Sequence, residues 1–201
     1  MSFASLEPDA ASRCFMAVPA KAKNSEFNMK EANAEERAGF KGSDVKEWEA
    51  ILGMGAVKVH YGREAQTIRN TMPQRVITSR MIRRKKPMPG VGNFKYKSRW
   101  CVHGHRDPDG ASLQTYSPMP SSEAIVMFFQ VSCNMRFKVA LADVTNAFCQ
   151  SAKLDRPHGP LYVIPCEGLD LPKDCLIELV VPVYGLDDAP LRWHETVVSF
   201  F

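Results

Sequence analysis

The stretch from residue 75 to residue 103 constrains the fold of this chain more than any other. It contains two segments in which basic and apolar residues alternate, "RVITSRMIR" at 75–83 and "FKYKSRWCVH" at 94–103. Alternation with a period of two places one kind of side chain on each face of a β-strand. The connection "KKPMPGVGN" has the proline and glycine of a loop between paired strands. We therefore expect a β-hairpin that buries one face and presents charge on the other.

The net charge of +4 conceals an uneven distribution of charge along the chain. No acidic residue occurs between Glu64 and Asp107, whereas from Asp107 to the end acidic residues outnumber basic ones. Phe94, Tyr96 and Trp100 are interleaved with the basic residues of this stretch. Basic side chains beside aromatic rings suit a nucleic-acid backbone or a triphosphate. A merely solvated basic surface would have the same composition, and it is the alternative.

Length and composition bound the class of protein. A chain of 201 residues with 45% hydrophobic content has room for one domain. No apolar run approaches the roughly 18 residues of a membrane span, and the opening "MSFASLEPDAASRCF" has no apolar signal core. The six cysteines form no C-x-x-C pair, which favours reduced thiols. We expect an intracellular protein, cytoplasmic or nuclear, that is neither secreted nor membrane-bound.

Two helices are expected in the first two thirds of the chain. Residues 1–42 have few large apolar groups and are expected to form a flexible or partly helical lead-in. A helix is expected to begin at Asp44, with Asp44 and Glu47 as a capping pair, and to end at "LGMG". Ser121 or Ser122 can cap a second helix that continues to about Met135. Its expected apolar face comprises Ala124, Met127, Phe128 and Val131.

Strands and a final helix are expected in the last third. "RFKVALAD" at 136–143 predicts a buried strand that ends at Asp143, and "TNAFCQS" predicts a short helical turn after it. Further strands are expected at 161–164 and 176–183. A last helix is expected to start at Asp187 or Asp188 with Pro190 in its first turn, and the chain ends inside this helix as if truncated.

The carboxylate of Asp143 has two possible roles. A carboxylate at the end of a strand is commonly a cap or a solvated side chain. If the chain turns tightly here, however, the backbone N–H groups of residues 144–147 can face a phosphate bound beside the carboxylate. Phe148 follows, with the small Ala147 beside it to permit close approach. This layout is compatible with a site for a metal ion and a triphosphate.

Five segments in order carry a resemblance to a known family. They are "KSRW", "TYSP", "LADVTNAF", "LYVIP" and "VYGLDDAPLRWH". Over about residues 44–201 the chain resembles the reverse transcriptase domain of copia-type retrotransposons. The resemblance implies an α+β fold, with right-hand polymerase fingers and a partial palm built from antiparallel sheets and packed helices. Residues 43–201 would be the partial domain, and the parent activity would be RNA-directed DNA polymerisation on an RNA or DNA primer–template with deoxynucleotide triphosphates.

The same resemblance implies roles for individual residues. Asp143 would be the first catalytic aspartate, binding Mg²⁺ or Mn²⁺ in a two-metal nucleotidyl transfer, with the carbonyl of Val144 as a companion ligand. Phe148 would be the gate that rejects a 2′-hydroxyl. The nucleotide would be bound by Lys97, Arg99, Thr145, Asn146, Ala147, Phe148, Tyr184 and Gly185. In the basic stretch 65–106, nucleic acid would be bound by Arg80, Arg83, Arg84, Lys85, Lys86 and Lys95.

Departures from the family pattern limit the expected activity. Asp187 and Asp188 replace the usual Lys-Gln, which places negative charge near the expected path of a polyanion unless the pair points outward. The paired-aspartate motif that completes the metal site lies beyond the Tyr-Gly-Leu segment and is absent from this chain. We therefore expect no polymerisation by this chain alone. The alternatives are a non-catalytic nucleic-acid-binding remnant and a product without a stable fold, and the sequence does not determine the oligomeric state.

Overall fold

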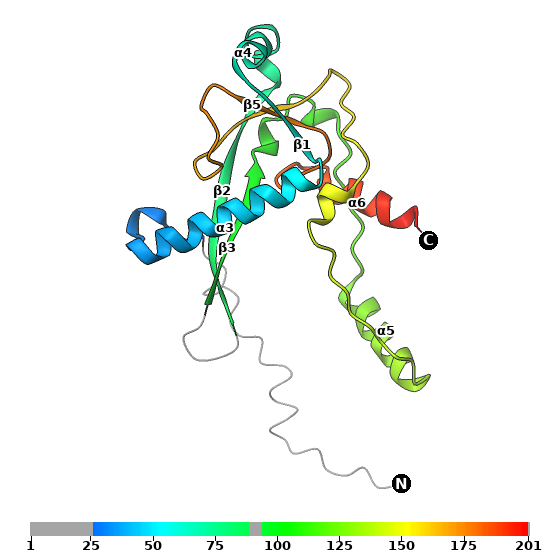
Figure 1. Ribbon diagram of the computed structural model, residues 1–201. Coiled ribbons are helices and arrows are strands. Elements are labelled where there is room, and N and C mark those ends of the chain that lie inside the picture. Colours follow the sequence, from blue (N-terminus) through cyan, green and yellow to red (C-terminus); the bar gives the residue numbers. More distant parts are fainter. Residues whose placement is uncertain (1–25, 89–93, 201) are drawn as a thin grey trace.

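The computed structural model describes residues 26–88 and 94–200 and has a mixed α/β architecture, which confirms the expected α+β class (Figure 1). One five-stranded sheet has the order β1-β5-β4-β2-β3, in which β2 and β4 are parallel and the other neighbours antiparallel. The strands are β1 (Val57–His60), β2 (Val76–Pro87), β3 (Phe94–Val102), β4 (Tyr162–Ile164) and β5 (Leu176–Leu179). The helices are α3 (Ala34–Gly53), α4 (Gly62–Thr71), α5 (Ser122–Asn134) and α6 (Ala189–Val198). The short 3-10 helices are η1 (Met29–Glu31), η2 (Pro73–Arg75), η3 (Gly104–Arg106), η4 (Gly110–Ser112) and η5 (Ala147–Gln150).

The β2–β3 hairpin confirms the pair of strands expected from the alternating pattern. The two strands are antiparallel from Ser79, opposite Val102, to Pro87, opposite Phe94. β2 extends beyond the expected boundary and takes up the first residues of "KKPMPGVGN". The connection is therefore shorter than expected, and its residues 89–93 lie outside the described part.

Helix α3 begins ten residues earlier than expected. Asn33 and Glu36 form a capping box, in which the Asn33 side chain accepts from the Glu36 N–H and the Glu36 carboxylate accepts from the Asn33 N–H, both at 2.8 Å. The prediction that Asp44 starts the helix is wrong. Asp44 lies in the middle of α3, is buried, and receives hydrogen bonds from Arg83 of β2, with 2.6 Å between Arg83 Nη2 and Asp44 Oδ2. Residues 34–42 of the predicted lead-in at 1–42 are thus helical, and its residues 1–25 lie outside the described residues.

The core forms where α3 crosses the sheet. Trp48 of α3 meets Trp100 of β3 edge-to-face with ring centroids 5.5 Å apart, and Phe40 meets Tyr96 at 4.8 Å. Trp100 and Phe40 are fully buried. Burying aromatic side chains of this size removes a large apolar area from water, so this contact anchors α3 on the hairpin.

β3 is an outer strand of the sheet, and helix α3 covers its free edge. The side chain of Ser43 accepts a hydrogen bond from the Ser98 N–H at 2.8 Å, and Glu47 Oε1 accepts from the Trp100 N–H at 3.4 Å. An uncovered edge strand leaves N–H groups available for pairing with other chains. Here two side chains one helical turn apart satisfy two of them.

Residues 136–143 do not form the expected strand. They are irregular and exposed, and the side chain of Leu141 is completely exposed. Helix α5 just before them is present as expected, and the Ser121 side chain caps it by accepting from the Ala124 N–H at 3.2 Å. Its expected apolar face is not buried, since Met127, Phe128 and Val131 are all exposed. Figure 1 shows α5 on an arm that extends away from the sheet.

The last third otherwise follows the expected order with shorter strands. β4 lies within residues 161–164, β5 covers only the first half of residues 176–183, and η5 confirms the helical turn after Asp143. α6 has Asp188 at its N-cap position and Pro190 in its first turn, as expected, but the Asp188 side chain makes no capping hydrogen bond. Within residues 26–88 and 94–200, no helix has the length and apolar content needed to cross a membrane.

Asp188 is instead part of a buried ion cluster. Its carboxylate accepts two hydrogen bonds from Arg156, at 2.7 and 2.8 Å, and Arg156 Nε donates to Asp107 at 3.0 Å. Nearby, Arg75 Nη1 lies 2.6 Å from Asp109 Oδ2, and both side chains are buried. The suggestion that the 187–188 pair points outward is therefore wrong for Asp188, and only Asp187 is exposed.

Candidate functional site

The β2–β3 hairpin has two chemically different faces. In the observed register Ile82 is opposite Arg99, and Arg84 is opposite Lys97. Opposite residues of paired strands project on the same side of the sheet. The face away from α3 therefore presents Arg80, Ile82, Arg84 and Lys86 from β2, with Lys95, Lys97, Arg99 and Cys101 from β3. The other face, with Met81 and Trp100, packs against α3.

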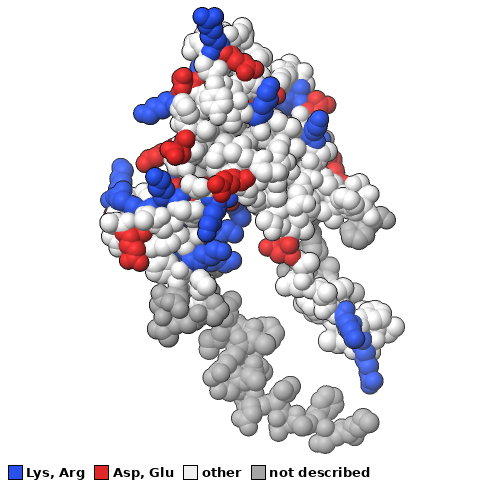
Figure 2. Space-filling view, in the orientation of Figure 1, with Lys and Arg blue, Asp and Glu red and all other residues white. Residues whose placement is uncertain are grey.

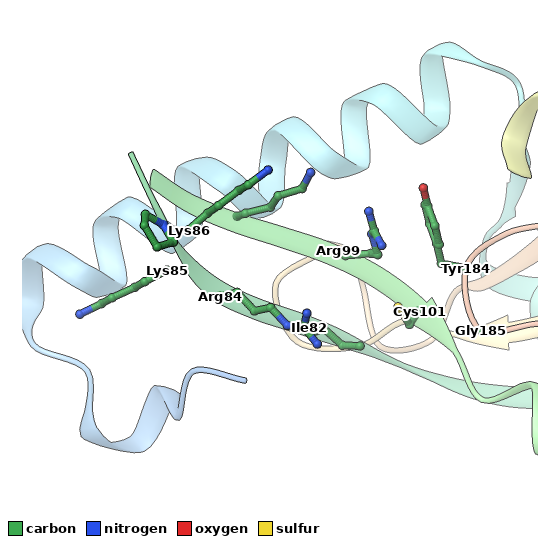
Figure 3. A pocket seen from close by; sticks show the side chains of 10 residues that line it. Ile82, Arg84, Lys85, Lys86, Arg99, Cys101, Tyr184 and Gly185 are labelled. Carbon is green, nitrogen blue, oxygen red and sulfur yellow. The ribbon is translucent and has the colours of Figure 1, made fainter. Parts of the chain in front are cut away.

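A pocket of about 500 Å³ lies over this basic face. Its lining includes four residues that the sequence assigned to nucleotide binding, namely Lys97, Arg99, Tyr184 and Gly185. Three residues assigned to nucleic acid also line it, namely Arg84, Lys85 and Lys86. The sequence did not single out Ile82, Pro87 and Cys101, although the alternating pattern places Ile82 and Cys101 on the same face. Figure 3 shows the side chains of Arg99 and Tyr184 standing side by side, from different segments of the chain.

Backbone hydrogen bonds fix the Tyr184–Gly185 segment to the end of β3. The Val102 N–H donates to the Tyr184 carbonyl at 2.9 Å, and the Gly104 N–H donates to the Gly185 carbonyl at 3.0 Å. Gly185 has φ +98°, and a Cβ added there would lie 2.1 Å from the Val102 carbonyl oxygen. Only glycine tolerates this combination, so the glycine brings residues 184–185 against the strand.

Arg99 and Tyr184 of the pocket lining contact each other, and Phe148 contacts Tyr184 although it does not line the pocket. The guanidinium carbon of Arg99 lies 4.0 Å from the centre of the Tyr184 ring, and the Phe148 ring lies 4.8 Å from that same ring. Burial raises the pKa of the Tyr184 hydroxyl, Arg99 opposes this shift, and the Asp143 carboxylate adds a smaller increase. The structure thus places Phe148 against Tyr184, which in turn contacts Arg99, although the three residues come from separate sequence motifs.

Several of the predicted nucleic-acid-binding residues have acidic partners within the chain. Arg83 pairs with Asp44 on the α3 side of the hairpin, and Lys85 pairs with Glu36 while lying 4.8 Å from the Phe94 ring centre. Arg80 pairs with Glu26 at 3.3 Å near the surface. Within the described ranges, no ion pair involves Lys86, Lys95 or Lys97. Figure 2 shows Lys and Arg side chains gathered over the lower half of the hairpin.

The segment around Asp143 is exposed rather than set at the end of a strand. Asp143, Val144 and Thr145 are exposed, and Asn146 adopts a left-handed conformation with φ 49° before η5 begins at Ala147. The expected tight turn is therefore present. The buried strand that was to position Asp143 is not.

The residues described do not fit a site for two divalent ions. Among residues 26–88 and 94–200, no group of three or more His, Cys, Asp or Glu side chains is arranged to hold a metal ion. A pair of Mg²⁺ or Mn²⁺ ions requires several anionic oxygen ligands together. Asp143 with the carbonyl of Val144 does not supply them.

Glu47 is the residue near the pocket that sequence reasoning placed elsewhere. It was assigned to a helix cap, but its carboxylate faces β3 and accepts the Trp100 N–H. Burial raises the pKa of Glu47, while the Trp100 N–H, Arg99 and Lys97 lower it. No sequence signal distinguishes such a residue, because its neighbourhood depends on where α3 crosses the hairpin.

Comparison with known proteins points to mobile elements. The chain is 25% identical over 175 residues to "Retrovirus-related Pol polyprotein from transposon RE2" of Arabidopsis thaliana. The match covers 84% of this chain but 12% of that protein, so the chain spans about an eighth of the length of the relative. No family model matches the chain, and no solved structure matches it. The similarity supports an origin in a retrotransposon Pol polyprotein.

Proposed function

We propose that this chain is part of the reverse transcriptase of a copia-type retrotransposon, and that its basic hairpin face binds the phosphates of nucleic acid or of a deoxynucleotide triphosphate. The observation that carries the proposal is the shared lining of one pocket. Lys97 and Arg99 come from one family motif and Tyr184 and Gly185 from another, more than eighty residues later in the chain. The similarity to a transposon Pol polyprotein is independent support.

Each side chain has a defined task in this proposal. Lys97 is exposed and carries a compact charge that suits a phosphate oxygen. Arg99 is held over the Tyr184 ring, so the fork of its guanidinium is oriented before a ligand arrives. Phe148 packs against the Tyr184 ring and limits the space beside a sugar. The turn at residues 144–147 offers backbone N–H groups beside Asp143.

We assign no catalytic step to this chain by itself, because the described residues do not form the metal site. Polymerisation belongs to the parent enzyme, and the similar Pol polyprotein is about seven times as long as this chain. The second candidate function, a non-catalytic nucleic-acid-binding remnant, is favoured by this lack of a metal-binding cluster together with the basic face.

Binding and extension assays together test both candidates. Fluorescence anisotropy with a labelled RNA–DNA primer–template should show binding that weakens steeply between about 50 mM and about 200 mM salt. The Lys97→Ala variant should bind more weakly and flatten the slope of log affinity against log salt by about 0.7 to 0.9 for each phosphate that it no longer neutralises. Lys58→Ala is the matched control, since Lys58 is exposed on β1, away from the pocket.

Primer extension with Mg²⁺ separates the candidates. We expect no extension by this chain. Extension that Asp143→Ala abolishes would overturn the statement that this chain does not polymerise. A failure to bind primer–template at low salt, or equal losses for Lys97→Ala and Lys58→Ala, would refute the proposed binding face.

A further inference from the structure

The cations on the basic face of the β2–β3 hairpin are arranged in rows across the two strands. Opposite residues of an antiparallel pair have Cβ atoms about 4.5 to 5.5 Å apart and project on the same side of the sheet. Three successive rows are Arg99 opposite Ile82, Lys97 opposite Arg84, and Lys95 opposite Lys86. Each row therefore offers at least one cation, and a phosphate placed at the second or third row lies within reach of two.

The spacing of these rows follows from the geometry of the strands. Successive rows are two residues apart along each strand, which corresponds to about 6.6 to 6.8 Å. Neighbouring phosphates of a nucleic-acid strand are separated by a sugar and lie about 6 to 7 Å apart. Neighbouring phosphates of a triphosphate share one bridging oxygen, so the whole triphosphate is only about as long as one row spacing. The rows therefore match the repeat of a polynucleotide.

The pocket over the basic face connects the three rows. Its lining includes at least one cation from each of them. In Figure 3 Lys86 lies toward one end of the hairpin, and Arg99 lies toward the other end, beside Tyr184. In the described part of the chain, no ion pair involves Lys86, Lys95 or Lys97. The charges of these three lysines are therefore available to a ligand that runs the length of the pocket.

We propose that a strand of nucleic acid lies along the hairpin, with one phosphate at each row from Lys86 to Arg99. This inference rests on the proposed function of the basic face, and it names the ligand of that face as a polynucleotide rather than a deoxynucleotide triphosphate. The Tyr184–Gly185 segment, fixed by hydrogen bonds to the end of β3, borders the path beyond Arg99. A tetranucleotide, which has three internucleotide phosphates, is the shortest ligand that fills the three rows.

The test measures how the salt dependence of binding changes with the length of the ligand. The probes are fluorescein-labelled oligothymidylates of two, four and eight nucleotides without terminal phosphates, followed by fluorescence anisotropy. For a single strand, the slope of log affinity against log salt falls by about 0.7 for each phosphate that the protein neutralises. The magnitude of the slope should therefore be about 0.7 for the dinucleotide and about 2 for both the tetranucleotide and the octanucleotide.

A double variant tests the row farthest from Tyr184. Lys86→Ala combined with Lys95→Ala removes both cations of that row, so the slope for the tetranucleotide should fall to about 1.4. Binding of the dinucleotide, and of thymidine triphosphate measured by competition, should stay within about twofold of wild type, because the other two rows are sufficient for them.

The matched control is Lys58→Ala combined with Lys153→Ala. It makes the same change in net charge at two exposed lysines beside β1 and β5, on the far side of the sheet from β3. This control should leave the slope for the tetranucleotide unchanged. Equal losses for the two double variants would show that binding depends on net charge alone, and would overturn the row arrangement.

Failure of this inference is distinguishable from failure of the proposed function. If the wild-type slope does not increase from the dinucleotide to the tetranucleotide while thymidine triphosphate competes, the face binds a nucleotide and the strand assignment fails. A slope that keeps rising in proportion to length up to the octanucleotide would also contradict a path of three rows. If neither the octanucleotide nor the triphosphate binds at low salt, the proposed function fails and this inference fails with it.

Discussion

Replacing Arg156 with methionine would leave two buried carboxylates without the cation that neutralises them. The Arg156 side chain is 1% exposed and donates to Asp188 at 2.7 and 2.8 Å and to Asp107 at 3.0 Å. Methionine fills a similar volume, so the change isolates the loss of charge and hydrogen bonds. Removing one partner of a buried ion pair costs about 3–5 kcal/mol of unfolding free energy. A domain is stable by only about 5–15 kcal/mol, so the variant should lose about a fifth of its stability or more.

Urea denaturation followed by tryptophan fluorescence measures this loss, because Trp48 and Trp100 meet in the core. With a slope of roughly 2 kcal/mol per molar urea, the midpoint should fall by about 1.5 to 2.5 M. Arg192→Met is the control, since Arg192 is 36% exposed and reaches Asp188 at 3.3 Å from one nitrogen. The Arg192→Met variant should lose less than about 1 kcal/mol of unfolding free energy.

The pH dependence of the same measurement follows from Asp188. Burial alone would raise its pKa, but hydrogen bonds and charges from Arg156 and Arg192 hold it below the ordinary value. A carboxyl group with a lowered folded pKa contributes stability above its unfolded pKa of about 4 and loses that contribution as the pH falls. The difference between wild type and Arg156→Met should therefore be largest at neutral pH and shrink in acid. A loss below about 1 kcal/mol at neutral pH, or equal losses for the two variants, would refute the reasoning.

Three further changes test other parts of the structure. Gly185→Ala should destabilise the fold by more than about 1 kcal/mol in urea and weaken phosphate binding, because its φ is +98° and its Cβ would strike the backbone of β3. Asn33→Ala should cost about 1 kcal/mol by removing the capping box of α3, whereas Asn33→Asp should restore most of it. Alkylation near pH 8, mapped by mass spectrometry, should modify the exposed Cys133 before Cys101 and Cys149, since burial raises the pKa of each of these two thiols to about 11. Faster modification of Cys101 or Cys149 would contradict the packing around it.

Local patterns were sufficient where an element depends on its own sequence. The alternating segments at 75–83 and 94–103 form the expected hairpin, because the connecting loop brings adjacent strands together. Ser121 marks the start of α5 because a cap is a contact within one turn. The motifs also selected Lys97, Arg99, Tyr184 and Gly185, and these four residues line one pocket although they come from distant segments.

Patterns were insufficient where an element depends on a distant partner. The start of α3 was missed because Asp44 lies among its buried positions, and only Arg83 on β2 makes a carboxylate acceptable there. Residues 136–143 have the composition of a buried strand, yet a strand also needs neighbours for its N–H and C=O groups. In the described part of the chain β1 and β3 are the edge strands, and residues 136–143 pair with neither.

Periodicity, turn chemistry and charge along the chain determined the basic hairpin, whereas the α+β class and the set of residues proposed to meet phosphate were expected from the resemblance of the chain's ordered motifs to a known family. Only the tertiary structure decided which charges are available. It directs Arg83 and Lys85 to acids on α3, buries Asp188 against Arg156, and leaves Lys97 exposed. The reason is physical, because the cost of a charge depends on its solvent and its neighbours, and both are set by the packing of segments far apart in sequence.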